Sequence, residues 1–215
     1  MHAKRARLDV QTAMAFLSTR VKEPDQDDWK KPQQSINYLR GTQDPVLTLS
    51  ADDSFVMKWH VDGSHLVHQD MKGHTGANPS LGTGTIHAKS AKQKLNARSS
   101  AETELVSVDD CMPQTLWTNL FMKEQGHSVG GTVAHQDNKS TTLLENNGTF
   151  SGGKRTKHIQ ARFHFITDQI KKGNVSIEHC PTKEMIADFS PSLCKVNCSF
   201  NCAIKSWVSK KKGDI

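Results

Sequence analysis

Apolar residues recur along the chain with two different periods, and these periods predict a fold that mixes strands and helices. Apolar and polar residues alternate between residues 55 and 62, which is typical of a strand with one buried face. Weaker alternating runs predict four more strands, at about 75–81, 84–90, 132–135 and 175–179. Apolar residues three and four positions apart predict helices over 8–21, about 29–41, 99–126, 140–146, 155–173 and 183–189.

Local signals refine the ends of these elements. Ser99 is followed three residues later by Glu102, a capping box in which the hydroxyl accepts a free backbone N–H and the carboxylate reaches back to the cap. Proline disrupts a helix interior, so we expect Pro32 in the first turn of its helix and a kink at Pro113. Pro79 removes a ladder donor and argues against a regular central strand at 75–81.

Acidic residues lie on or beside several of the predicted elements. Asp62 ends the first strand, Asp137 lies where a strand passes into a helix, and Asp188 lies on the last helix. Glu102 and Glu104 flank the apolar stripe of the helix after Ser99, and periodicity alone does not say which faces a cleft; Glu104 is the freer acid, because Glu102 is engaged at the cap. Three of these positions also have an ordinary interpretation: a hairpin turn at Asp62 and the glycine after it, a solvated glutamate on the helix, and a helix cap at Asp137.

Composition narrows the class of partner. The chain has 215 residues, enough for one domain plus an attachment, and 35% of them are hydrophobic, enough for an ordinary core. Its net charge of +6 favours a polyanionic partner, although basic tails alone can give the same figure. No run of 18 apolar residues occurs, and the N-terminus lacks the apolar centre of a signal peptide, so no membrane partner is expected.

Three further groups of residues have a chemical and an ordinary interpretation. The five cysteines are expected to be reduced thiols in an intracellular protein, and Cys194, Cys198 and Cys202 form a helical spacing rather than a zinc motif. The histidines near residues 60–74 match no zinc spacing, and we expect them to be exposed to solvent. A basic stripe on the helix at 155–173 is either a solvated face or a face that contacts phosphates; it comprises Lys154, Arg155, Lys157, His158 and Arg162.

Several motifs, taken in order, resemble a known family. They are WHVDGSHLVHQDMKGHTG, KQKLNARSSAETELVSVDD, HQDNKSTTLLENNG, GKRTKHIQARFHFITDQI and EHCPTKEMIADF. Together they resemble the ribonuclease H domain at the end of a copia-type retrotransposon Pol polyprotein. DVQTAMAFLSTRV and DDWKKPQQSINYLRGT resemble the last helices of the preceding reverse transcriptase. The resemblance implies an α/β fold with a five-stranded mixed sheet in the order 3-2-1-4-5, flanked by helices, with an N-terminal helical pair.

The same resemblance implies how the chain is divided. Residues 1–50 correspond to the remnant of the reverse transcriptase thumb or connection helices, residues 51–190 to the ribonuclease H-like domain, and residues 191–215 to a poorly ordered basic tail. The polymerase part with its own paired aspartates is missing, so we expect no DNA synthesis. A proline at residue 79 and an altered segment after Asp188 depart from the family pattern and put stability in question more than chemistry.

The resemblance also implies a site and an activity. Four carboxylates, Asp62, Glu104, Asp137 and Asp188, would bind two Mg²⁺ or Mn²⁺ ions and hydrolyse the RNA strand of RNA–DNA hybrids. We expect Arg98 and the basic stripe to contact the hybrid backbone, His179 to assist product release, and the protein to be a monomer. The alternative is a catalytically inactive, truncated fragment of a retroelement that at most binds nucleic acid.

Overall fold

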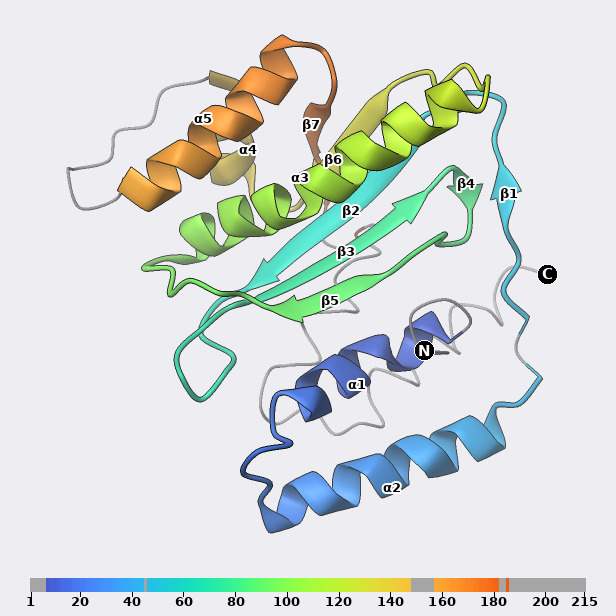
Figure 1. The fold of residues 1–215 in the computed structure, drawn as a ribbon, viewed down its shortest axis with the longest axis vertical. Coiled ribbons are helices and arrows are strands. Elements are labelled where there is room, and N and C mark those ends of the chain that lie inside the picture. Colours follow the sequence, from blue (N-terminus) through green and yellow to red (C-terminus); the bar gives the residue numbers. More distant parts are fainter. Residues whose placement is uncertain (1–6, 45, 148–156, 182–184, 186–215) are drawn as a thin grey trace.

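The computed structural model describes residues 7–44, 46–147, 157–181 and 185. Its centre is a mixed sheet of five strands, beside which α3, α4 and α5 pack together, while α1 lies against the edge strand β5 (Figure 1). The strands of this sheet are β2 (Met57–Ser64), β3 (His74–Ser80), β5 (Lys89–Lys92), β6 (Thr132–Gln136) and β7 (Ser176–His179). The helices are η2 (Leu8–Val10), α1 (Gln11–Ser18), α2 (Gln26–Gly41), α3 (Ser100–Glu124), α4 (Lys139–Asn147) and α5 (Lys157–Lys171).

The strand order confirms the predicted topology. The strands lie in the order β5-β3-β2-β6-β7, which is 3-2-1-4-5 when the five are numbered along the chain. β2 pairs antiparallel with β3 and parallel with β6, and β7 extends the parallel half. The chain therefore has the predicted ribonuclease H-like fold. A small second sheet, β1 (Ser50–Ala51) with β4 (Gly82–Thr83), was not predicted.

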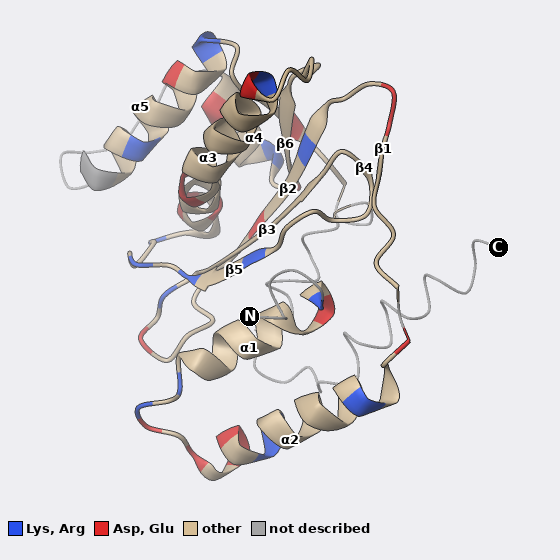
Figure 2. Ribbon diagram, turned by 45° about the vertical axis from the view of Figure 1, so that its right-hand side comes forward, with Lys and Arg blue, Asp and Glu red and all other residues tan. Residues whose placement is uncertain are grey.

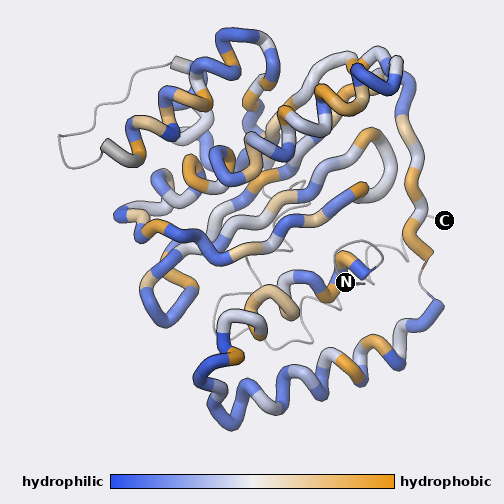
Figure 3. Tube along the Cα trace, in the orientation of Figure 1, coloured by the Kyte–Doolittle hydropathy of each residue, from blue (hydrophilic) through white to orange (hydrophobic). Residues whose placement is uncertain are grey.

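The core forms where the apolar face of β2 meets the helices. Met57, Trp59 and Val61 alternate along β2 and are buried against Leu105 of α3 and Phe163 of α5. This is the alternation that predicted the strand. Its apolar residues are buried because α3 and α5 cover the same face of the sheet. In contrast, α2 is mostly hydrophilic along its length (Figure 3), and its Trp29 is 73% exposed.

Four details of the predicted elements are wrong. β2 continues through Asp62 to Ser64, and Asp62 pairs with Gly76, so a hairpin turn at Asp62 is excluded. β3 includes Pro79, which is tolerated because β5 pairs with β3 only as far as Ala77. The strand expected at 84–90 is β5, which begins at residue 89.

The fourth detail concerns the second helix. α2 begins at Gln26, so that Pro32 lies inside it rather than in its first turn. A capping box explains the earlier start, because the Asp25 side chain accepts from the Asp28 N–H at 2.7 Å and the Asp28 side chain accepts in return. The expected helix at 183–189 and the tail at 191–215 lie outside the described residues, apart from Met185, whose side chain is buried. Cys111 and Cys180 are free thiols, and the three tail cysteines also lie outside the description.

Histidines join the N-terminal helices to the sheet. His68 Nε2 lies 3.0 Å from His74 Nδ1, His74 Nε2 lies 2.7 Å from Ser90 Oγ, and Phe16 of α1 stacks on His68. The expected solvent exposure is therefore wrong for His68 and His74, and also for His60, because neighbouring elements cover them. Burial lowers the pKa of each of the three imidazoles to about 4, which keeps them neutral near pH 7.

Within the part of the chain that the structure describes, no helix combines the length and apolar character needed to span a bilayer.

Gly63 permits the close approach of β2 and α3. A Cβ at this position would lie 2.6 Å from Ser107 Oγ and 2.9 Å from the Thr103 carbonyl oxygen. We therefore expect Gly63→Ala to lower the free energy of unfolding by about 1–3 kcal/mol, measured by urea denaturation. Gly41→Ala is the control, since a Cβ there meets nothing within 4 Å. Equal effects of the two substitutions would contradict this interpretation of the packing.

Candidate active site

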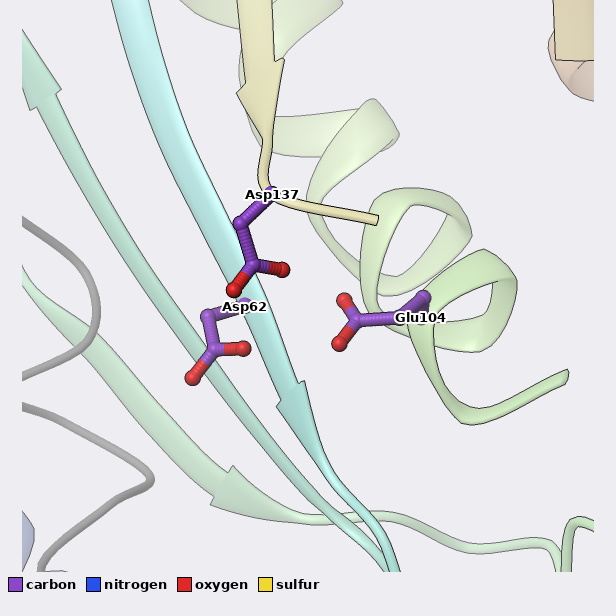
Figure 4. Close-up of side chains that lie close together, drawn as sticks. All are labelled: Asp62, Glu104 and Asp137. Atoms are coloured by element: carbon purple, nitrogen blue, oxygen red, sulfur yellow. The ribbon is translucent and has the colours of Figure 1, made fainter. Parts of the chain in front are cut away.

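Three acidic side chains from separate segments converge at one point beside the sheet. Asp62 lies on β2, Glu104 lies in the second turn of α3, and Asp137 directly follows β6. One carboxylate oxygen from each of the three lies within 4.8 Å of the others. Figure 4 shows the three carboxylates facing a common space.

The sheet topology brings the two aspartates together. β2 and β6 run parallel, and their last paired residues are His60 and His135. Asp62 and Asp137 each follow two residues later, so they emerge side by side where the two strands cease to pair. This is the carboxyl end of parallel strands, where open α/β sheets place their ligands.

The start of α3 decides between the two glutamates. Ser99 Oγ accepts from the Glu102 N–H at 3.2 Å, and the Glu102 carboxylate accepts from the Arg98 N–H at 2.7 Å. Glu102 is thus engaged at the helix start, although it bonds the residue before the cap rather than the cap itself. Glu104 is buried, with 5% of its surface exposed, and it faces the aspartates. The structure therefore resolves the ambiguity in favour of Glu104 as the member of the cluster.

The cluster is electrostatically unfavourable by itself. Burial, followed by the negative charges of Asp62 and Asp137, raises the pKa of Glu104 well above its ordinary value, and a bond from the Gly63 backbone opposes that rise. Glu104 Oε2 is buried without a hydrogen-bond partner among the described residues. A bound cation would supply that partner and neutralise the repulsion. Hard carboxylate oxygens suit Mg²⁺ or Mn²⁺ rather than zinc, so the residues present fit such an ion.

A further acid near the cluster, which is fully buried, was missed by the sequence analysis. Glu145 of α4 is 1% exposed, and neither of its carboxylate oxygens has a partner in the described part of the chain. Burial raises the pKa of Glu145 to about 8, and the charge of Glu145 contributes to the rise at Glu104. The sequence carried no signal for this burial, because local periodicity could not show which face of α4 is covered.

The remaining predicted site residues do not join the acidic cluster in the part of the chain that the structure describes. Asp188, Lys154 and Arg155 lie outside the described residues, as do the side chains of Lys157 and His158. Lys and Arg are spread over α2, α5 and the segments around β5 rather than gathered on one element (Figure 2).

Three predicted residues in the described part have definite surroundings. Arg98 is exposed just before α3. Arg162 of α5 pairs with Asp109 and, at 3.4 Å, with Asp110, both on α3. His179 is exposed at the end of β7, and its Nε2–H donates to the Asp137 carbonyl oxygen at 3.1 Å, which places it beside one of the clustered acids.

Sequence comparison identifies the class of relatives. No family model matches the chain. It is 27% identical over 183 residues to the retrovirus-related Pol polyprotein from transposon TNT 1-94 of Nicotiana tabacum, and 30% identical over 184 residues to that from transposon RE2 of Arabidopsis thaliana. Each match covers 85% of this chain but only 14% and 12% of the relative, so the chain spans about an eighth of the polyproteins that it matches.

Solved structures with a similar arrangement are more distant in sequence. LC11-RNase H1, isolated from compost, is 15% identical, with 71% of this chain and 97% of that chain covered and a TM-score of 0.45. The prototype foamy virus protease-reverse transcriptase is also 15% identical, with 72% and 23% covered and a TM-score of 0.49.

Fold and relatives agree on the class. The chain has a ribonuclease H-like fold with an acidic cluster at the end of its parallel strands. It is homologous to one segment of copia-type Pol polyproteins from plant transposons, which confirms the resemblance found in the motifs.

Glu145 makes the stability of the folded protein depend on pH in a specific way. An acid whose pKa is raised on folding is more protonated in the folded than in the unfolded state, so stability falls as pH rises from about 4.5 to about 8. Glu145→Gln removes this contribution, and we expect the variant to be more stable by about 3 kcal/mol at pH 7 and equally stable at pH 4. Thermal and urea denaturation over this pH range measure the difference.

The control for this prediction is Glu124→Gln, which changes an exposed acid at the end of α3. It should leave the pH profile of stability as it is in the unchanged protein. A Glu145→Gln profile parallel to the unchanged one would show that this carboxyl does not titrate differently on folding.

Proposed function

We propose that this chain is a ribonuclease H domain that hydrolyses the RNA strand of RNA–DNA hybrids with the help of Mg²⁺ or Mn²⁺. The convergence of Asp62, Glu104 and Asp137 from three segments of a ribonuclease H-like sheet is the observation that carries the proposal. The homology to Pol polyproteins supports it, since it places the chain among proteins of retroelements.

The three carboxylates of the proposed site are held in place by different elements of the fold. Asp62 lies on β2 and Asp137 directly follows the adjacent strand β6, so the sheet fixes their separation, whereas Glu104 lies on a helix and closes the cluster from the side. The raised pKa of Glu104 means that its ionised form depends on a nearby positive charge. Divalent ions held by these carboxylates would supply activation of a water molecule and stabilisation of the leaving oxygen of a phosphodiester. The protein's contribution is to hold these acids in place and partly away from water.

Asp188 is proposed as the fourth acid, and with it the site would hold two ions rather than one. Three carboxylates with oxygens within 4.8 Å of one another could hold a single ion. A second ion requires further oxygen ligands, because Mg²⁺ prefers near-octahedral oxygen coordination. This part of the proposal rests on the family resemblance at Asp188.

Recognition of the hybrid is proposed to depend on its backbone. RNA-containing duplexes are read through shape, phosphates and 2′-hydroxyls rather than base sequence. Arg98 is exposed six residues before Glu104, and the segment of Lys154, Arg155, Lys157 and His158 supplies further positive charge. Arg162 is held by Asp109 and Asp110, so we propose that it orients α5 against α3 instead of contacting phosphate. His179 lies beside Asp137 and is proposed to assist product release.

The direct test is cleavage of a hybrid with labelled RNA in Mg²⁺ or Mn²⁺. We expect Asp137→Asn to lower the cleavage rate by more than about 100-fold, because it removes a charged ligand from the cluster. Asp27→Asn is the matched control, since Asp27 is an exposed acid on α2 that pairs only with the nearby Lys30 among the described residues. Full activity of Asp137→Asn would reject the role of the acidic cluster in the proposed reaction. No cleavage by the unchanged protein at any concentration of either metal would reject the activity in favour of an inactive fragment.

Binding of the hybrid provides a separate test. Removing one cation that contacts a phosphate lowers the magnitude of the slope of log binding constant against log salt concentration by about 1. We expect this change for Arg98→Ala in hybrid binding measured by fluorescence anisotropy with Ca²⁺ in place of Mg²⁺. Arg40→Ala removes an equally exposed arginine from α2 and should leave the slope unchanged. Identical slopes for both variants would remove Arg98 from the proposed binding face.

A further inference from the structure

Two buried glutamines hold consecutive carbonyl groups of α3 at the candidate site. Gln93 Nε2 donates to the Thr103 carbonyl oxygen at 3.0 Å, and Gln136 Nε2 donates to the Glu104 carbonyl oxygen at 3.2 Å. A carbonyl oxygen only accepts, so the amide N–H must be the donor in both bonds. Gln93 directly follows β5 and Gln136 ends β6, and these strands lie on opposite sides of β2. The start of α3 is thus held from both directions.

The position of Gln136 is itself well fixed. Its side chain has 0% of its surface exposed and follows the buried positions of β6, on the face that meets α3. Its carbonyl oxygen accepts from the Cys180 N–H at 2.7 Å, which ties it to the end of β7. Asp137 is the next residue along the chain. Gln136 therefore connects the backbone of Glu104 to β6, the strand that leads directly into Asp137.

The bond from Gln136 is a poor source of stability. Its amide oxygen, Oε1, is buried and has no partner among the described residues. A buried amide with one end unsatisfied costs free energy that an apolar side chain of similar size would not. The Glu104 carbonyl belongs to the helix ladder of α3, so losing the amide would not leave it without a donor. The effect of this bond is therefore on position more than on folding.

We propose that Gln136, with Gln93 as its counterpart, is a positioning residue that sets the reach of Glu104 toward Asp62 and Asp137 and thereby the affinity of the cluster for a divalent cation. The inference rests on the proposed function, since it takes the three acids as metal ligands. Partners that orient metal ligands without touching the metal change metal affinity by about 10- to 100-fold when they are removed.

Binding of Mn²⁺ to the purified full chain, followed by electron paramagnetic resonance, tests the proposal. We expect Gln136→Met to weaken Mn²⁺ binding by about 10-fold while the unfolding temperature without metal is unchanged or raised. Gln136→Asn keeps the amide but withdraws it by one methylene, and it should weaken binding as well. Gln93→Met should also weaken Mn²⁺ binding. It should in addition lower the unfolding temperature, because Gln93 also donates to Thr75 and Ser107.

Gln11→Met is the matched control. Gln11 Nε2 donates to the Ala88 carbonyl oxygen at 2.7 Å, and its own Oε1 also lacks a partner in the described part, so the bond is of the same kind. It links α1 to the segment before β5 rather than to α3, and its loss should leave Mn²⁺ affinity unchanged. Glu104→Gln defines the signal expected when the cluster is incomplete.

The outcomes separate this inference from the proposed function. Unchanged Mn²⁺ affinity in folded Gln136→Met and Gln136→Asn overturns the positioning role, as does an equal loss in Gln11→Met. Absence of Mn²⁺ binding in the unchanged protein overturns it too. If the unchanged protein binds Mn²⁺ through Glu104 but cleaves no hybrid, the proposed function fails, and the role of Gln136 is decided by the affinities alone.

Discussion

Close packing of α3 on β2 is the constraint on which the arrangement of the carboxylates depends. The helix can approach the strand only where β2 has no side chain on that face, and Gly63 provides this place opposite Thr103 and Ser107. Glu104 follows Thr103 directly, so the same contact that seats the helix also determines where its carboxylate emerges. Packing in protein interiors is dense enough that a displacement of the helix would be transmitted to this side chain.

The electrostatics of the site oppose folding while they favour a cation. Asp62 and Asp137 raise the pKa of Glu104 together with burial, and Glu145 adds a further buried acid with a pKa of about 8. Glu104 and Glu145 are both more easily protonated in the folded state, so each lowers stability as pH rises through its range. A divalent ion would relieve the repulsion within the triad. Stability without metal and affinity for metal are therefore linked through the same charges.

The N-terminal helices are joined to the sheet by contacts of a different kind. Gln11 bonds the backbone at Ala88, and Phe16 stacks on His68, whose imidazole lies in a chain with His74 and Ser90. Gln11 and the two imidazoles are buried, and the imidazoles are neutral near pH 7. The segment that resembles the end of a reverse transcriptase is thus packed against the edge strand of the sheet, although the boundary between the two domains stays a prediction.

The sequence alone indicated most of the helices and strands and named Asp62, Glu104 and Asp137 among the candidate acids. The alternation in β2 reflects the apolar face that packs with α3 and α5, and the spacing after Ser99 reflects the apolar side of a helix, because local periodicity records which faces meet a core. It also specified the cap that engages Glu102. The family resemblance, carried by short motifs in order, supplied the sheet order and the expected chemistry.

Only the tertiary structure showed which polar side chains are buried and how far the strands pair, because the sequence patterns carry no information on either. Periodicity does not say what lies opposite a given face, so the burial of Glu145, of the histidines near β3 and of the two glutamines beside Glu104 could not be predicted. The continuation of β2 through Asp62 and the tolerance of Pro79 in β3 depend on where neighbouring strands begin and end. Burial, pairing and charge coupling are relations between segments distant in the chain, and they exist only once the sheet has formed.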